Sequence, residues 1–164
     1  MKLSEKYDNT LVRRQDRLLD FNRAFELLNN NEYGFLALGG DEGYGLPINF
    51  VLADDCIYFH CAPEGEKLNR ISKNNKACFC TVGYTNPLPS KFSTEYESVM
   101  VFGKIEIVTD DGERMKALEY IIDKYSPEFK EKGKMYAGKS FGRTAILRID
   151  IERVSGKSKK MLPM

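Results

Sequence analysis

Apolar and polar residues alternate with the two-residue period of a β-strand in six segments of this chain. The glycine-rich residues 39–43 follow the first of these segments and suit a hairpin turn. The six predicted strands cover residues 33–38, 46–53, 56–61, 77–84, 98–109 and 144–151. Since most consecutive strands are joined by short turns, we expect an antiparallel sheet.

Two segments carry the 3.6-residue period of an amphipathic helix. In the first, apolar side chains recur behind Asp20, a favourable N-cap residue. In the second, residues 110–125, an acidic first turn precedes an apolar stripe that stops at Ser126-Pro127. A third, shorter helix is predicted for residues 63–72, because Pro63 suits a first helical turn.

These elements predict a mainly β fold with peripheral helices, inserted after the third and fifth strands. A six-stranded antiparallel sheet that closes into a small barrel removes the edges that favour aggregation. Such a barrel encloses little space, so a ligand would bind outside it or between subunits. At 164 residues the chain fits one domain, residues 1–164, with irregular arms expected at 1–19 and 157–164.

The charge of the chain is nearly balanced, with 25 Lys and Arg residues against 24 Asp and Glu residues. A broad basic face for nucleic acid is therefore not expected, and the basic clusters at 13–17 and 157–160 are interpreted as solvated charge or small-ligand contacts. No apolar run reaches the roughly 18 residues of a membrane helix, and no apolar segment follows Met1-Lys2 as in a signal peptide. We expect a cytoplasmic protein without a membrane partner.

The cysteines fit reduced thiols in such a compartment. The four are Cys56, Cys61, Cys78 and Cys80. Their spacings, Cys-x4-Cys and Cys-x-Cys, match none of the usual zinc patterns. All four lie in predicted strands, where cysteine packs as a small apolar residue. We therefore predict no metal site.

Motifs for several common chemistries are missing from the sequence. No Gly-x-Gly-x-x-Gly opens a helix after a strand, and no Gly-x-Ser-x-Gly elbow is present. His60 is the only histidine, so a pair of histidines cannot share a reaction. In isolation, His60 is most simply a structural histidine, and Lys67 a solvated surface lysine.

One stretch, residues 46–68, combines features that suit a ligand. Pro47 cannot donate a backbone hydrogen bond, so it belongs at a strand start, an edge or a bulge, where neighbouring backbone groups are free. The two strands of this stretch lead into the short helix, where Lys67 follows Gly65 in the first turn. Backbone N–H groups and a lysine at a helix start favour a phosphate. The stretch therefore predicts a flat slot beside an anion site.

Short motifs occur in a specific order along nearly the whole chain, from about Arg13 to Lys157. They are Tyr-Gly-Phe-Leu-Ala (33–37), Leu-Pro-Ile-Asn-Phe (46–50), Ile-Tyr-Phe-His (57–60), Gly-x-Lys-Leu (65–68), Tyr-Glu-Ser-Val-Met-Val-Phe-Gly (96–103), Ala-Leu (117–118), Lys-Tyr-Ser-Pro (124–127), Arg-Thr-Ala-Ile-Leu-Arg-Ile-Asp-Ile (143–151) and Gly-Lys (156–157). This order resembles the pyridoxamine 5′-phosphate oxidase-like split-barrel flavoproteins. Within that family it is most similar to the nitroimidazole-resistance proteins.

The resemblance implies a homodimer that binds FMN in the groove between two split barrels. It implies that the isoalloxazine ring contacts the backbone of Pro47, Ile48, Asn49 and Phe50. It further implies that the ribityl and phosphate side contacts His60, Cys61 and Ala62, and that the phosphate contacts Lys67 and Leu68. The fifth strand, from one subunit or the other, would contact FMN through Glu97, Ser98 and Val99. In the nitroimidazole-resistance branch the histidine at the position of His60 also lies near the reacting centre. His60 is therefore the candidate catalytic residue.

The resemblance leads us to expect an FMN-dependent oxidoreductase that reduces small oxidised aromatics such as nitro compounds, with His60 as a proton donor. An alternative is a non-catalytic flavin- or haem-related binding or storage protein. A pyridoxamine 5′-phosphate oxidase-type enzyme is a further alternative. It is disfavoured because those enzymes carry a C-terminal segment with Trp and Arg for the substrate, whereas this chain has no Trp.

Overall fold

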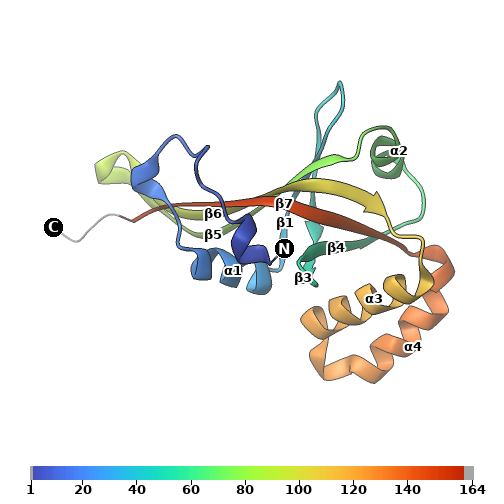
Figure 1. Ribbon diagram of the computed structural model, residues 1–164. Helices are drawn as coiled ribbons and strands as arrows, with labels where there is room; N and C mark the ends of the chain where they lie inside the picture. The colour runs from blue at the N-terminus through green and yellow to red at the C-terminus, as the bar shows by residue number, and fades with distance from the viewer. Residues whose placement is uncertain (1, 161–164) are drawn as a thin grey trace.

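An antiparallel sheet of seven strands forms the centre of the structure, a computed structural model that describes residues 2–160 (Figure 1). The strands are β1 (Tyr33–Leu38), β2 (Tyr44–Asn49), β3 (Val51–Ala53), β4 (Cys56–Cys61), β5 (Lys76–Leu88), β6 (Ser93–Ile107) and β7 (Ala145–Lys159). Their order in the sheet is β2-β1-β5-β6-β7-β4-β3, and every neighbouring pair is antiparallel. The predicted mainly β class and antiparallel topology are confirmed.

The predicted number of six strands was wrong, because the chain changes partners at Phe50. Before Phe50, β2 pairs with β1; after it, β3 pairs with β4. The apolar pattern continues across this residue, so the sequence predicts one strand over residues 46–53. β2 and β3 are the first and last strands of the sheet, and Phe50 alone separates them along the chain. The sheet therefore curls until its two edges meet at Phe50, which gives a split barrel.

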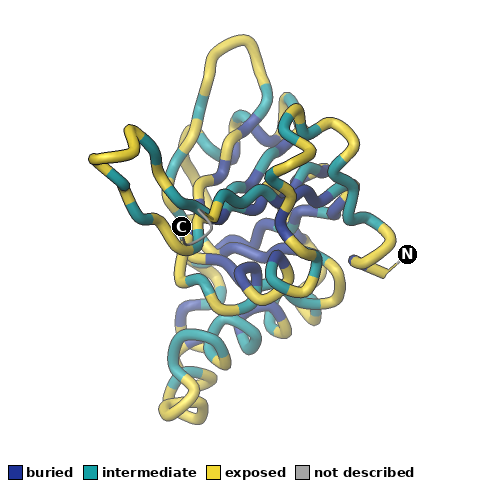
Figure 2. The backbone as a smooth tube through the Cα atoms, turned by 90° about the vertical axis from the view of Figure 1, so that its left-hand side faces the viewer, coloured by how far each residue is buried: buried dark blue, intermediate teal, exposed yellow. Residues whose placement is uncertain are grey.

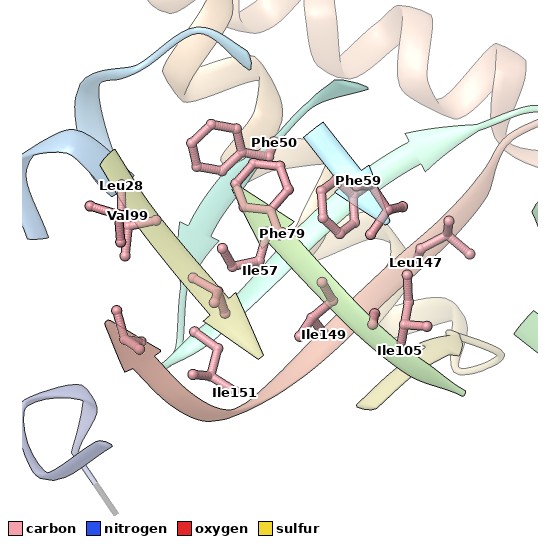
Figure 3. Packing of buried hydrophobic residues seen from close by; sticks show 14 of the residues in the cluster. Leu28, Phe50, Ile57, Phe59, Phe79, Val99, Ile105, Leu147, Ile149 and Ile151 are labelled. Atoms are coloured by element: carbon pink, nitrogen blue, oxygen red, sulfur yellow. The ribbon is translucent and has the colours of Figure 1, made fainter. Parts of the chain in front are cut away.

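Aromatic side chains fill the inside of the curled sheet (Figure 3). Phe50, Phe59 and Phe79 are completely buried. The Phe79 ring centroid lies 4.6 Å from that of Phe50 and 5.5 Å from that of Phe59. Burial of each such side chain contributes about 1.5–3 kcal/mol to stability. The residue at which the sheet closes is thus also one of the main residues of the core.

The outer face of β4 is covered by two helices, α3 (Asp111–Tyr125) and α4 (Lys130–Ser140), which lie as a pair below the sheet in Figure 1. They form a second apolar cluster, in which Ala117 and Leu118 of α3 and Ala137 of α4 pack with Tyr58 and Ile146. Alternation along β4 explains both clusters, because Tyr58 points to the helices and Phe59 into the barrel.

The other helices are α1 (Phe21–Asn30) and α2 (Glu66–Lys73). The Asp20 carboxylate caps α1 and accepts the N–H of Asn22 at 2.8 Å, as its position in the sequence predicts. The N-cap residue of α2 is Gly65 and its first residue is Glu66, so the helix begins later than Pro63 suggests. Five 3-10 helices complete the described elements: η1 (Leu3–Lys6), η2 (Gln15–Arg17), η3 (Pro89–Lys91), η4 (Pro127–Phe129) and η5 (Phe141–Arg143).

Three strands are longer than their apolar patterns indicate. β5 and β6 extend past the barrel as a hairpin through the predicted loop at 85–93, with η3 at its tip. β7 continues to Lys159, into the expected C-terminal arm, while residues 161–164 lie outside the described residues. In the expected N-terminal arm, Leu3 and Leu19 are buried against the barrel. Figure 2 shows the exposed tip of the β1–β2 hairpin at the top of the molecule. Among the described helices, none is both long and apolar enough to cross a bilayer.

Candidate functional site

β2, the strand for which a flat ligand slot is predicted, lies at an edge of the sheet. β1 pairs with one side of it, and within residues 2–160 no strand pairs with its other side. Pro47 and Asn49 are exposed, whereas Ile48 packs against the barrel core. An edge strand is one of the three positions predicted for Pro47, beside a strand start and a bulge. Along β2, one row of backbone groups is therefore available to a flat ligand.

Tyr125 of α3 holds the end of this strand. It lies in one of the sequence motifs, but no role at the site is predicted for it. The Tyr125 hydroxyl accepts the backbone N–H of Phe50 at 2.9 Å and lies 2.8 Å from the Phe50 carbonyl oxygen. The Glu32 carbonyl is 2.6 Å from the same hydroxyl and also accepts the Asn49 side-chain amide at 2.9 Å. Burial raises the pKa of Tyr125, so the hydroxyl keeps its proton. These bonds fix the backbone where β2 becomes β3.

The start of α2, where an anion site is predicted, has the geometry that such a site needs. Gly65 has φ 119°, which favours glycine, and a Cβ built there would meet no atom within 4 Å. No side chain of the described residues caps this helix start, so the N–H groups of its first turn are available to an anion. Lys67 is half-buried in that turn. Open space, free donors and a lysine together suit a phosphate.

His60 and Cys61 lie next to each other near the end of β4 but on opposite faces of it. Cys61 packs against the barrel core, and burial raises its pKa despite the nearby charge of Lys67. His60 points away from the barrel, and both burial and the Lys67 charge lower its pKa. His60 is an exposed residue, but the neighbouring protein partly desolvates its imidazole and, with the Lys67 charge, favours the neutral ring. The Lys67 charge acts on the pKa of both residues, so Lys67 lies near each of them.

The exposed surface of His60 opens into a cavity of about 470 Å³ between β4, α3 and α4. Its lining is mostly apolar and includes Ile121 and Ile122 of α3 and Tyr136 of α4. The strand pattern did not indicate this cavity, because its wall comes from α4, a segment for which the sequence predicts at most short helical turns. The sequence contains one indication of the cavity, because side chains alternate along β4 and this alternation places His60 on the same side as Tyr58.

The three candidate flavin-contact residues on β6 lie on two different faces of the strand. Glu97 and Val99 point into the barrel, and both are buried. The Glu97 carboxylate accepts hydrogen bonds from the Arg23 guanidinium at 2.8 and 3.1 Å, which lower its pKa. Ser98 faces outward and pairs with Lys157 of β7. Of these three, Ser98 presents its side chain on the outer face of the sheet.

The structure brings His60 and Cys61 near Lys67. It places the β6 candidates elsewhere, because Cys61 pairs with Ala145 at the start of β7, whereas Ser98 pairs with Lys157 near its end. The side chains of Phe50 and Leu68 are both buried in the barrel core. Ala62 is exposed between β4 and α2. Among the described residues, no group of three or more His, Cys, Asp or Glu side chains could hold a metal ion.

A known protein family and several solved structures are similar to this chain. The profile described as pyridoxamine 5′-phosphate oxidase matches residues 20–158. A structure assigned to 5-nitroimidazole antibiotic resistance in Bacteroides thetaiotaomicron matches with a TM-score of 0.69 and 21% identity, covering 87% of this chain and 86% of that one. A search of curated proteins found no significant match.

Two further structures extend the comparison. A flavocytochrome from Azotobacter vinelandii gives a TM-score of 0.79 at 19% identity, over 96% of this chain and 76% of that one. A FAD-binding protein from Mesorhizobium loti gives a TM-score of 0.66 at 22% identity, over 88% of this chain and 98% of that one. At such identities the likeness shows a shared fold.

Proposed function

The chain belongs to the pyridoxamine 5′-phosphate oxidase family, and on this basis we propose that it is a flavoprotein that binds FMN. The observations that carry the proposal are the uncapped start of α2, with Gly65 and Lys67, and the contact of this helix with the edge strand β2, where Arg70 lies 4.8 Å from the centroid of the Tyr44 ring. An anion site near a flat strand edge fits a ligand with a phosphate at one end and a planar ring at the other. Two structures with this fold are described as a flavocytochrome and a FAD-binding protein, which supports a flavin as the ligand.

In this proposal each part of the site has one task. Lys67 and the first N–H groups of α2 hold the phosphate, and the backbone of residues 47–50 faces the ring. Tyr125 keeps that backbone in place through its bonds to Phe50. The flavin, when bound, supplies the electron transfer, which no side chain of the chain provides.

The second part of the proposal is a homodimer formed through the outer face of the sheet. On this face Phe35 lies opposite Cys80, and Cys80 opposite Met100. Phe35 is 50% exposed and Met100 38% exposed. A row of apolar side chains across neighbouring strands is typical of a protein interface. Phe35→Glu would place a charge there, and we expect sedimentation velocity to show a monomer for this variant and a dimer for the wild type.

The reaction we propose is the reduction of a small oxidised aromatic, such as a nitro compound. The structure assigned to nitroimidazole resistance shares this fold and supports the choice. His60 lies close enough to Lys67 for their charges to interact, and its lowered pKa leaves it neutral near pH 7. A neutral imidazole can donate one hydrogen bond to the substrate, and it can relay a proton to the product when its other nitrogen takes one up from water.

The proposal is tested by adding FMN and FAD separately to the purified protein and measuring absorbance, dissociation constants and thermal shift. We expect a flavin spectrum and tighter binding of FMN; equal or tighter binding of FAD would change the cofactor assignment. If neither FMN nor FAD binds, the proposed function is wrong. The reaction is tested by oxidising the reduced protein–FMN complex with a nitroaromatic, which we expect to be faster than with free reduced FMN.

A non-catalytic flavin- or haem-related binding protein is the second candidate. The observation that favours it is the fold shared with a flavocytochrome over 96% of this chain. Equal rates of oxidation for bound and free reduced FMN would support this role.

A further inference from the structure

The β5–β6 hairpin ends in a tip, residues 88–93, which projects beyond the barrel at the left end of Figure 1. Phe92 at this tip is 98% exposed. Its backbone is left-handed, with φ 47° and ψ 45°, a conformation that is strained for a residue with a bulky side chain. A fully exposed aromatic side chain at a strained position adds nothing to the packing of its own chain, and it is typical of a residue that contacts another molecule.

A small pocket on the outer face of the sheet, here called the β1 pocket, has the size that such a ring needs. It is lined by Asn31, Glu32, Tyr33, Gly34, Phe35 and Val82. Its volume is about 220 Å³, whereas a cavity of about 150 Å³ already holds benzene in another protein. The pocket therefore has room for one phenyl ring.

The side chains around the β1 pocket also suit an aromatic ring. Tyr33, Phe35 and Val82 are 54%, 50% and 47% exposed, so apolar surface at this pocket faces water. The ring centroids of Tyr33 and Phe35 are 5.9 Å apart at an interplanar angle of 72°, an edge-to-face contact. A further ring that docks beside them extends this aromatic contact and removes apolar surface from water.

The charges beside the tip and beside the pocket are complementary. Lys91 directly precedes Phe92, and Glu32 lines the pocket. Both Lys91 and Glu32 are exposed, and within residues 2–160 neither forms a salt bridge. An ion pair at an exposed rim adds little affinity, but it favours one orientation of the partners over others. The charges therefore match a contact in which the tip enters the pocket.

The tip cannot reach the β1 pocket of its own chain. Pairing of β5 with β6 continues as far as Leu88 and Ser93, which keeps the hairpin extended. From Val82 to Leu88 a strand spans roughly 20 Å, at about 3.3 Å per residue. A second copy of the chain can bring tip and pocket together. A two-fold axis that crosses the hairpin between them forms both contacts at once, which closes the assembly at a dimer.

We propose that Phe92 of each subunit docks into the β1 pocket of its partner, with Lys91 beside Glu32. This inference rests on the homodimer of the proposed function, and it assigns the segments that hold the dimer together. It also connects the dimer to the proposed flavin site, because the Glu32 carbonyl oxygen accepts hydrogen bonds from the Tyr125 hydroxyl at 2.6 Å and the Asn49 amide at 2.9 Å. The docked tip therefore covers the segment that supports the end of β2.

Replacing Phe92 by p-benzoylphenylalanine, which forms a covalent bond to a neighbouring C–H group under ultraviolet light, tests the contact directly. We expect a product with the mass of two chains on a denaturing gel, and mass spectrometry should locate the new bond within residues 31–35 or at Val82. The same replacement of Phe129 is the control, because Phe129 is also an exposed aromatic residue, at 62%, and lies outside the proposed interface. No bond from position 92, or a bond to another surface, would overturn the proposal.

Sedimentation equilibrium of variants tests the energetics of the contact. We expect Phe92→Ala to raise the dissociation constant of the dimer about tenfold, and Phe129→Ala to leave it unchanged. Lys91→Glu should also weaken the dimer, and adding Glu32→Lys to the same chain should restore it, because the pair is then reversed. All of these variants should fold, since the replaced side chains are exposed. An unchanged dissociation constant for Phe92→Ala, or no restoration in the double variant, would contradict the docking.

These experiments distinguish failure of the docking from failure of the proposed function. If Phe92→Ala leaves the dimer intact, the docking is wrong, whereas the homodimer and flavin binding stand. If the wild type is a monomer, the homodimer and the docking are both wrong, and FMN binding is still measured by absorbance. If the dimer dissociates in Phe92→Ala but the wild type binds neither FMN nor FAD, the docking stands and the flavin function is wrong.

Discussion

The Tyr125 hydroxyl accepts the backbone N–H of Phe50 at 2.9 Å, although 75 residues separate the two along the chain. This bond connects the last turn of α3 to the point where the sheet closes. It links the helix that forms one wall of the cavity to the strand edge proposed to face the flavin. Much of the predicted behaviour of the site depends on this contact.

Replacing Tyr125 by Phe should loosen the junction between β2 and β3. The buried N–H of Phe50 would lose its acceptor, which costs about 1–3 kcal/mol. Urea denaturation should show this loss, and FMN binding should weaken with it. Tyr136→Phe is the control, because the Tyr136 side chain is exposed. Equal stabilities for the two variants would contradict the structural role of Tyr125.

Replacing Lys67 by Ala should weaken FMN binding without unfolding the protein. Loss of a charged hydrogen bond to the phosphate corresponds to about 1–3 kcal/mol in the free energy of binding. Lys73 is the last residue of the same helix and serves as the control, since Lys73→Ala should leave the dissociation constant unchanged. An unchanged dissociation constant for Lys67→Ala would move the phosphate elsewhere.

The pKa of His60 should lie below the ordinary histidine value of 6.5, because of burial first and the Lys67 charge second. Lys67→Met should raise this pKa only part of the way, since the larger cause remains. A lowered pKa in the folded state means that the unfolded state binds more protons, so His60 costs stability as the pH falls below 6.5. NMR titration of the single imidazole measures both values. A pKa at or above 6.5 in the wild type would contradict the desolvated position of the ring.

The Lys124 ammonium group is buried without a hydrogen-bond partner in the described residues, 3.8 Å from the centroid of the Phe50 ring. Burial lowers its pKa to about 8 from 10.5. The unfolded chain therefore binds more protons between these values, and the stability of the wild type should rise from pH 8 to 10.5 relative to Lys124→Met. Parallel unfolding curves of the two proteins over this range measure the difference. A flat difference would show that attraction to the Phe50 ring offsets the desolvation.

Arg23 pairs with the buried carboxylate of Glu97 at 2.8 Å, and Arg23→Met should leave that charge without its main partner. We expect a loss of about 2–3 kcal/mol, less than for a fully buried pair because Arg23 stays partly exposed. Arg23 lowers the pKa of Glu97, so this contribution is present at neutral pH and is lost on acidification. Urea denaturation at pH 7 measures it, with Glu26→Gln as the control that removes only the surface pair of Arg23. FMN affinity should not change, whereas a large change would show that Glu97 contacts the flavin.

The features that the sequence determined by itself are those that depend on neighbouring residues. Helix α1 begins directly after Asp20, and α3 ends before Ser126. Both ends are predictable because N-cap residues and prolines determine helix ends within a few residues. Strand periodicity located the strands and the apolar faces of the sheet, although it merged β2 and β3 into one strand. Gly65 and Lys67 led to the proposed anion site, since both lie in one short segment.

The tertiary structure alone decided the features that depend on distant residues. The division of one predicted strand at Phe50 follows from pairing with β1 on one side and β4 on the other, which no local pattern encodes. The contact of Tyr125 with Phe50 and that of Arg23 with Glu97 each join positions more than 70 residues apart. The cavity beside His60 exists because α4 packs against α3. Local spacing could therefore indicate the proposed anion site, whereas the cavity beside His60 depends on the packing of distant elements.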